Sequence, residues 1–445
     1  MKNPIVGLVV VASHVESGGE RGQALLSEAR TALRDAGMDV VGPSEVVWDV
    51  SGAASAARRV RDAHANLLLI LHCSWVVDSL QLLLVRDSGI PALLWAVPYP
   101  ETYSLASVKH FSSVLARVGI FSRWGYGLPT EPRFAEQTAD LARTAAVVAR
   151  FRSSRAALVT TRSTWRVAGP QDATYDEWDM STSLGITIVH VEMEDFVSRV
   201  ASIGERDARD VLAQKVGHYG HVEVGDDRLV PSAKVYLAAK LLRDEMELDA
   251  LAVACYPTHF GLCNLAASWL SDEGWHLDPE GDVGHAVMAN ALMALRPVPV
   301  ALAEPVMLDR QQDLLYLRHE GSAPASVAVD ASQVYVIPCG DATGTIVEFP
   351  LRAKSQTTAV TFAGRNGSYK LWTARLTVEP VSIEDWTRLG RGFLAAVSCR
   401  GGGSHLLDAA FDAGTDHHML LQEGDTVGAV ADLAGMWGIE TVNLV

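Results

Sequence analysis

Short, uninterrupted apolar runs alternate with amphipathic helical patterns along the first part of the chain. "IVGLVVVAS" is followed by "GERGQALLSEARTALRDAG", and "NLLLILHC" is followed by "SLQLLLVRDSG". Runs that are apolar at every position, rather than at alternate positions, are typical of strands buried on both faces of a parallel sheet. The sequence therefore predicts an α/β fold that begins with a doubly wound, Rossmann-like parallel sheet.

The same pattern starts again further along the chain and then changes. "RAALVTT", "GITIVHV" and "DALAVACYP" are separated by helical patterns such as "PSAKVYLAAKLLRDEME". Later runs, such as "QVYVIP", "GTIVEFPL" and "SYKLWTARLTVEPV", are bounded by Gly, Asn, Ser and Pro, which is typical of antiparallel strands. We predict an N-terminal α/β domain at 1–152, a Rossmann-like middle domain at 153–318 and a C-terminal antiparallel, barrel-like β domain with a terminal helix at 319–445.

The charge and cysteine content narrow the class of partner. The formal net charge of −16 argues against nucleic acid or an anionic membrane as the main partner, because both attract basic surfaces. The 5 cysteines are scattered and none has CxxC spacing, which argues against a disulfide framework and a thiolate zinc site. The apolar run near the start is too short to span a bilayer. We expect a cytoplasmic protein that acts on a small molecule.

Oxygen and imidazole ligands recur at four places late in the chain. They are Glu280 in "DPEGDV", Glu304 in "VALAEPV", His319 in "LYLRHEGSAP" and the pair His417–His418 in "GTDHHML". Each has an ordinary structural alternative: a helix-start acid, a strand-end carboxylate, a solvent-facing strand histidine and a turn. Together, two carboxylates and two imidazoles suit Mn²⁺ or another divalent metal with positions left open for water or substrate. Spacing alone does not show that they converge.

Five segments in order carry a resemblance to a known family: "LVPSAKVYLAAKLLRDEMELDALAVACYP", "DPEGDVGHAVMANALMAL", "PVPVALAEPV", "LLYLRHEGSAPASVA" and "HHMLLQEGDTV". On these segments the chain resembles the L-fucose and L-arabinose isomerase superfamily of metal-dependent aldose–ketose isomerases. The resemblance implies that Glu280 and Glu304, 24 positions apart, are both metal ligands and the acid/base pair. It further implies that His319 and His418 complete the Mn²⁺ site, that His417 contacts the sugar, and that the protein is a homo-oligomer, a trimer or hexamer, with sites at subunit interfaces.

The sequence also departs from that family. In "RHEG", Glu320 stands where many relatives have a cysteine, and "SHVESGGERG" replaces the N-terminal substrate segment of the arabinose enzymes. The likeness therefore extends to the superfamily and does not specify a sugar. Asp309, five positions after Glu304, is a fallback for the second carboxylate.

Further candidates for substrate contacts lie at predicted strand ends or on a helix after the first sheet. The resemblance implies that His110 reaches into a neighbouring subunit's site; its alternative is a solvated helix histidine. The tryptophans could stack on a sugar ring, although packing in a core or interface is their more common role. The full set is His110, Glu16, Trp75, Trp165, Arg21 and Arg162.

The leading hypothesis is a ketol isomerase that interconverts an aldose and its ketose through a cis-enediol. One alternative is a sugar-binding or regulatory protein that uses the same fold without turnover, because fold does not fix function. Another is an isomerase for a sugar that carries a sulfonate or carboxylate, for which Arg21 and Arg162 would be suitable partners, because bidentate arginine suits such anions.

Overall fold

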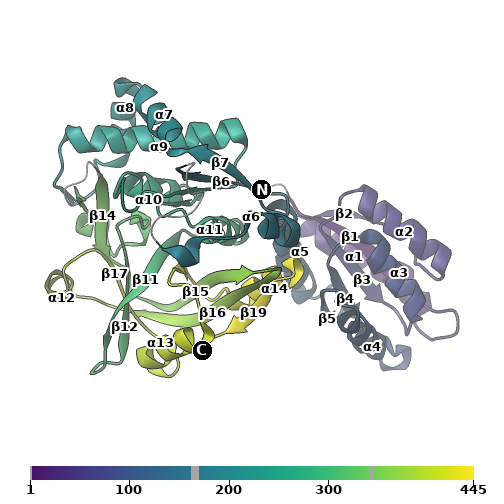
Figure 1. The fold of residues 1–445 in the computed structure, drawn as a ribbon. Coiled ribbons are helices and arrows are strands. Elements are labelled where there is room, and N and C mark those ends of the chain that lie inside the picture. Colours follow the sequence, from purple (N-terminus) through teal and green to yellow (C-terminus); the bar gives the residue numbers. More distant parts are fainter. Residues whose placement is uncertain (1–2, 162–169, 340–343) are drawn as a thin grey trace. The chain divides into compact units, whose positions relative to one another are not determined.

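The computed structural model describes residues 3–161, 170–339 and 344–445. The chain forms two compact units, Met1–Arg150 and Phe151–Val445, which are described separately (Figure 1). Within the described residues, no helix combines the length and apolar character that a membrane crossing requires.

The first unit is built on a five-stranded parallel sheet. Its strand order is β2-β1-β3-β4-β5, the order found in flavodoxin-like doubly wound sheets. The strands are β1 (Ile5–Val11), β2 (Asp39–Val41), β3 (Leu67–His72), β4 (Ala92–Ala96) and β5 (Ser122–Tyr126). The first predicted domain thus has the parallel α/β architecture that its continuous apolar runs indicate.

Helices cover both faces of this sheet. Buried residues of α2 (Val50–Asp62), α3 (Asp78–Ser88) and α4 (Ser104–Arg117) form one cluster with alternate residues of the strands. On the opposite face Phe134 of α5 (Pro132–Phe151) packs edge-on against Trp95 of β4, with 4.8 Å between ring centroids. The remaining helix, α1 (Gly22–Asp35), packs against β1. Their positions follow from the chain's alternation between strand and helix.

One glycine allows the close approach of α2 to the sheet. A Cβ atom at Gly7 of β1 would lie 2.5 Å from a methyl carbon of Val60 on α2. Any larger side chain at this position would therefore push the helix away from the strand or force Val60 out of its place.

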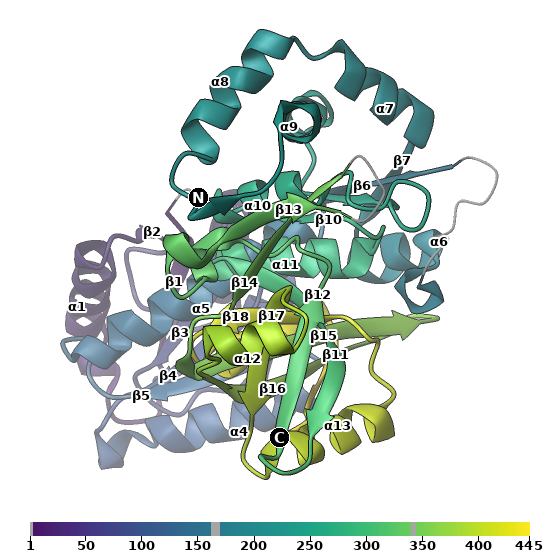
Figure 2. The ribbon, with the colours of Figure 1, turned by 90° about the vertical axis from the view of Figure 1, so that its left-hand side faces the viewer.

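The second unit starts with a four-stranded parallel sheet in the order β10-β9-β6-β7. Its strands are β6 (Arg155–Thr160), β7 (Thr187–Glu192), β9 (Ala250–Val253) and β10 (Leu277–Asp278). Helices α7 (Met193–Ser202), α8 (Glu205–Lys215) and α9 (Asp226–Met246) pack together on one side of it (Figures 1 and 2). This arrangement agrees with the second predicted βα series.

A ten-stranded mixed sheet follows, in the order β19-β16-β15-β18-β11-β12-β17-β14-β13-β8. Its strands are β8 (His221–Val222), β11 (Val300–Asp309), β12 (Leu314–His319), β13 (Tyr335–Pro338), β14 (Thr345–Pro350), β15 (Lys354–Arg365), β16 (Ser368–Glu379), β17 (Phe393–Ser398), β18 (Met419–Glu423) and β19 (Glu440–Asn443). Because β17 also pairs with β16, the antiparallel pairings of β16, β15, β18, β11, β12 and β17 form a circuit.

The prediction of a purely antiparallel C-terminal sheet needs correction. The pairs β14–β17, β16–β19 and β13–β8 are parallel. The sheet also takes in β11, so it crosses the predicted domain boundary between 318 and 319, and both sides of that boundary belong to one compact unit. Pairing between strands far apart in the sequence determines both features.

Helix α11 (Val283–Leu295) lies between the two sheets of the second unit. It contacts β6 and β9 of the parallel sheet and β11, β15 and β18 of the mixed sheet. Twelve of its residues are buried, which accounts for its apolar sequence "VGHAVMANALMAL". Its N-terminus therefore lies inside the unit, where unpaired N–H groups need protein partners.

An ion-pair network joins helices at the outside of this unit. The Glu273 carboxylate accepts hydrogen bonds from Lys215 at 2.6 Å, from Tyr236 at 2.6 Å and from Lys240 at 3.0 Å. Burial raises the pKa of Glu273, but these three donors outweigh it and lower the pKa to about 2. The network connects α8 and α9 to the end of α10 (Asn264–Asp272).

Candidate metal centre

The loop between β10 and α11 carries the first proposed ligand. Asp278 accepts hydrogen bonds through Oδ1 from the main-chain N–H groups of Glu280 and Asp282, both at 2.9 Å. Asp282 is the N-cap of α11, and its Oδ1 accepts the N–H of His285 at 2.9 Å. The helix-start role therefore falls to Asp282, and the Glu280 side chain is left for other contacts.

Strand pairing brings three further candidates to the same region. Glu304 of β11 lies opposite Arg318 of β12, directly before His319. Ala303 lies opposite Met419 of β18, so His418 precedes the first paired residue of that strand. Neighbouring strands thus hold Glu304, His319 and His418 near one another although the first and the last are 114 positions apart in the sequence.

The Glu280 carboxylate lies between two buried imidazoles. Its Oε1 is 3.8 Å from Nε2 of His319, and its Oε2 is 3.3 Å from Nε2 of His418. The His319 and His418 side chains are 1% and 0% exposed, so the alternative of a solvent-facing strand histidine at 319 is wrong. Ligand atoms of Glu280, His417 and His418 all lie within 4.8 Å of one another.

Glu304 and His417 form a more exposed part of the cluster. Oε2 of Glu304 is 3.8 Å from Nε2 of His417, and the two side chains are 34% and 31% exposed. The rings of His417 and His418 have centroids 4.0 Å apart. The buried ligand candidates Glu280, His319 and His418 thus adjoin a pair that solvent reaches.

Hydrogen bonds define the protonated ring nitrogens of two histidines. The main-chain N–H of Phe362 donates to Nε2 of His285 at 3.2 Å, so the His285 proton lies on Nδ1 and is donated to Oδ2 of Asp282 at 2.8 Å. The same oxygen accepts Nδ1–H of His418 at 2.9 Å. When the His418 ring is neutral, as a metal ligand must be, its Nε2 presents a lone pair toward Glu280.

These contacts fit a cation. The Nε2 atoms of His319 and His418 are buried without hydrogen-bond partners among the described residues, and both face the Glu280 carboxylate. A carboxylate behind Nδ1 of a histidine is a recurrent support for metal-ligating Nε2, and Asp282 holds that place behind His418. Imidazole and carboxylate donors suit Mn²⁺ and other first-row divalent ions.

The shifted pKa values of the cluster residues are consistent with a positive charge between Glu280, His319 and His418. Burial lowers the pKa of His319 to about 4 and keeps its ring neutral. Burial also acts to lower the pKa of His418, but its hydrogen bond to Asp282 and its close contact with the Glu280 carboxylate outweigh burial and raise that pKa well above its usual value. The pKa of Glu280 is lowered, since His418 and His319 outweigh the effect of burial. A proton or a metal ion would satisfy these carboxylates.

Asp282, His285 and His418 form a second cluster with metal-ligand geometry. Its contacts are already made, because Asp282 accepts both ring N–H groups and Nε2 of His285 accepts the N–H of Phe362. This cluster therefore supports the first one and is not a separate metal site.

Two further glutamates carry raised pKa values. Burial raises the pKa of Glu304, and the negative charge of Glu280 adds to the effect. Burial likewise raises the pKa of Glu320 to about 7, with contributions from Glu280 and Glu304. Glu320, the departure from the family pattern, thus lies electrostatically close to both proposed ligands. The fallback Asp309 does not, because its oxygens accept the N–H groups of the turn that follows β11.

Four of the other predicted substrate contacts belong to the first unit, which is described by itself. Arg21 pairs with Glu101 at 2.8 Å, and its guanidinium lies 4.3 Å from the centre of the Tyr99 ring. His110 pairs with Asp78 at 2.9 Å and is half exposed. These residues belong to the first unit, as do Glu16 and Trp75, which are partly buried. Arg162 and Trp165 lie outside the described residues.

Sequence reasoning missed several residues around the centre. Asp172 accepts the ring Nδ1–H of His417 at 2.7 Å, and that hydrogen bond is the main reason why the pKa of Asp172 falls to about 2. The Tyr175 hydroxyl lies 3.3 Å from Asp282 and 3.4 Å from Asp416. Asp172 and Tyr175 carried no usable signal in the sequence, whereas Asp282 was recognisable as an acid at a predicted helix start.

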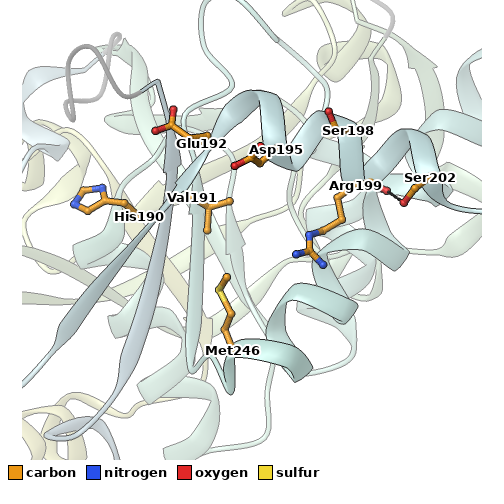
Figure 3. Close-up of a pocket in the computed structure, with 8 residues that line it drawn as sticks. All are labelled: His190, Val191, Glu192, Asp195, Ser198, Arg199, Ser202 and Met246. Atoms are coloured by element: carbon orange, nitrogen blue, oxygen red, sulfur yellow. Dashed lines mark hydrogen bonds between the residues drawn. The ribbon is translucent and has the colours of Figure 1, made fainter.

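An open cavity of about 780 Å³ lies elsewhere in this unit, beside β7 and α7 (Figure 3). It is lined by His190, Val191, Glu192, Asp195, Ser198, Arg199, Ser202 and Met246. Two of its polar side chains pair with residues beyond the lining: His190 with Glu177 at 2.8 Å and Arg199 with Glu245 at 2.6 Å. None of the proposed ligands lines it.

Comparison of the sequence with protein-family models and with curated proteins found no match.

Proposed function

We propose that this protein is a divalent-metal-dependent ketol isomerase that interconverts an aldose and its ketose through a cis-enediol. The observation that carries the proposal is the cluster at Glu280, where the unpartnered Nε2 atoms of His319 and His418 face one carboxylate. Glu304 and His417 adjoin it on the more exposed side. All five are among the residues that the family resemblance assigns to the metal and the sugar; His110, which it also assigns to a sugar site, belongs to the first unit.

The reaction makes specific demands on these residues. A proton leaves the carbon next to the carbonyl and returns to the neighbouring carbon, while a second proton moves between the two oxygens. Glu280 and Glu304 are the proposed acid/base groups for these two transfers. A bound divalent cation, with Mn²⁺ as the first choice, would supply charge stabilisation to both oxygens as the enediolate develops.

The solvent exposure of the remaining residues indicates which of them would bind the metal and which would contact the sugar. His319 and His418, both buried, hold the cation from inside the unit, and Asp282 fixes the ring of His418. His417 is about one third exposed and lies next to Glu304, so it is the proposed contact to a sugar hydroxyl. An oligomer with sites between subunits remains a prediction of the resemblance.

The direct test is hydrogen exchange at C2 of the sugar. Metal-stripped and Mn²⁺-loaded protein are incubated with a panel of aldopentoses and aldohexoses in deuterated water, and deuterium at C2 is measured by NMR. We expect exchange with at least one sugar, only with metal, and none in Glu304→Gln. Asp309→Asn is the matched control on the same strand, because Asp309 binds only the following turn. Metal binding without exchange for any sugar would refute the proposal.

The same variants separate this function from non-catalytic sugar binding. In an isomerase, Glu304→Gln removes an acid/base group and should abolish exchange, while a polyol still binds with reduced affinity because Glu304 is also a proposed metal ligand. If the unmodified protein binds sugars with metal present and exchanges no hydrogen, the sugar-binding alternative replaces the isomerase.

A further inference from the structure

His417 is held by a residue far from it in the chain. Asp172 lies in a short 3-10 turn, Gln171–Ala173, and is 245 positions away from His417. Its Oδ2 accepts the main-chain N–H of His417 at 3.0 Å and the ring Nδ1–H of the same residue at 2.7 Å. Both contacts lie within the second unit.

The two hydrogen bonds fix the orientation of the His417 ring as well as its distance from Asp172. One carboxylate oxygen takes both the main-chain and the ring donor of His417, so the side chain is held relative to its own backbone. Since a carboxylate only accepts, the ring proton must lie on Nδ1. The other ring nitrogen, Nε2, is directed away from Asp172 and toward Glu304.

The distance between Nε2 of His417 and Oε2 of Glu304 is 3.8 Å. This exceeds a direct hydrogen bond, whereas one hydroxyl oxygen placed beside the two atoms would be within reach of each. The partial exposure of both side chains leaves access for such a group.

We propose that Asp172 is a positioning residue that orients His417, so that its Nε2 and the Glu304 carboxylate together bind one hydroxyl of a polyhydroxy substrate. The identity of that substrate rests on the proposed function. The orientation of His417 itself does not, and it can be measured without turnover.

The first experiment reads the ring of His417 directly. The protein is labelled with ¹⁵N-histidine and loaded with diamagnetic Mg²⁺, and long-range ¹H–¹⁵N spectra are assigned with His417→Gln. We expect a protonated Nδ1 in the wild type and loss of that signal in Asp172→Ala. Asp172→Asn should retain it, because one amide oxygen can accept both donors. An unchanged His417 signal in Asp172→Ala would overturn the proposal.

The second experiment separates substrate binding from metal binding. Asp172→Ala should raise KM and the Kd of a polyol about tenfold, as expected for a lost hydrogen bond to a charged group, with kcat and the Mn²⁺ affinity changed less than about twofold. Asp172→Asn should have a smaller effect. Asp412→Asn, which removes an exposed acid from α13 (Gly402–Ala413), is the charge control.

The outcomes are distinguishable. If Asp172→Ala weakens Mn²⁺ as strongly as it weakens the polyol, His417 serves the metal and the proposal is wrong. If the wild type shows neither exchange nor polyol binding while the His417 signal behaves as expected, the proposed function fails although the Asp172 contact holds.

Discussion

Replacing Asp282 with asparagine tests whether the orientation of His418 matters for metal binding. Oδ2 of Asp282 accepts ring N–H groups from His285 at 2.8 Å and from His418 at 2.9 Å, and Oδ1 accepts a main-chain N–H at 2.9 Å. An asparagine must place an NH₂ group at one of these positions, where it faces a donor. We therefore expect a mismatch in every rotamer that the side chain can adopt there.

The magnitude follows from burial. Asp282 is 1% exposed, so water cannot replace the lost acceptor, and one unmade hydrogen bond costs about 1–3 kcal/mol of the free energy of unfolding. Loss of a carboxylate behind a ligating histidine typically weakens metal binding about 10- to 100-fold. Calorimetric titration with Mn²⁺ measures the second effect, and urea unfolding of the metal-free protein measures the first.

Asp278→Asn is the matched control in the same loop. Within the part of the chain that the structure describes, Asp278 accepts hydrogen bonds through Oδ1 alone, from two main-chain N–H groups, so an asparagine oxygen can replace it. Burial and the charge of Asp282 raise the pKa of Asp278 to about 7, so the titrations are run above that pH, where both variants remove one buried negative charge near Glu280. The Asp278 variant should therefore lose several-fold less Mn²⁺ affinity than the Asp282 variant. Equal losses would show that charge, not the orientation of His418, determines the affinity, and the reasoning would be refuted.

Three other predictions concern single residues. Glu280→Gln should abolish C2 exchange and weaken Mn²⁺ at least about 100-fold by calorimetry; unchanged affinity would exclude Glu280 as a ligand. The lowered pKa of Glu273 stabilises the fold above the unfolded value of 4.5, and this contribution is lost as the pH falls through about 2. Urea unfolding of wild type and Glu273→Gln should thus differ by about 1 kcal/mol near neutral pH, after allowance for exposure, and converge in acid; a constant difference would contradict it. Gly7→Ala should cost about 1–3 kcal/mol in thermal unfolding because of the clash with Val60, and a neutral result would contradict the close packing of β1 and α2.

The hydrophobic pattern within single segments was sufficient to predict the two parallel sheets. Strands such as β3 and β4 are apolar at every position because helices cover both faces, and that cause acts within one short segment. The mixed sheet was predicted less well. The strand formed by "GTIVEFPL" pairs antiparallel with β13 and parallel with β17, and nothing within the segment specifies its second partner.

In the candidate site, too, contacts between residues far apart in the sequence could not be predicted. Glu280, Glu304 and the late histidines could be proposed because their residue types are those of metal ligands. Their supporting contacts could not, since Asp172 is an ordinary loop acid until the fold brings it to His417. The first unit's candidates, His110 among them, are placed in that unit and their role in binding sugar remains a prediction.

The position of β18 has a consequence for how the protein is made. This strand is reached late in synthesis, after residue 418, yet it lies between β15 and β11, which the ribosome has produced long before. Strands β15 and β11 therefore cannot pair with each other in the native sheet. The edges that face β18 stay unpaired until β18 inserts between them. His418 enters the centre with the same strand, so the buried ligand set is incomplete until then. During refolding of the full chain, tight metal binding would report that β18 has taken its place between β15 and β11.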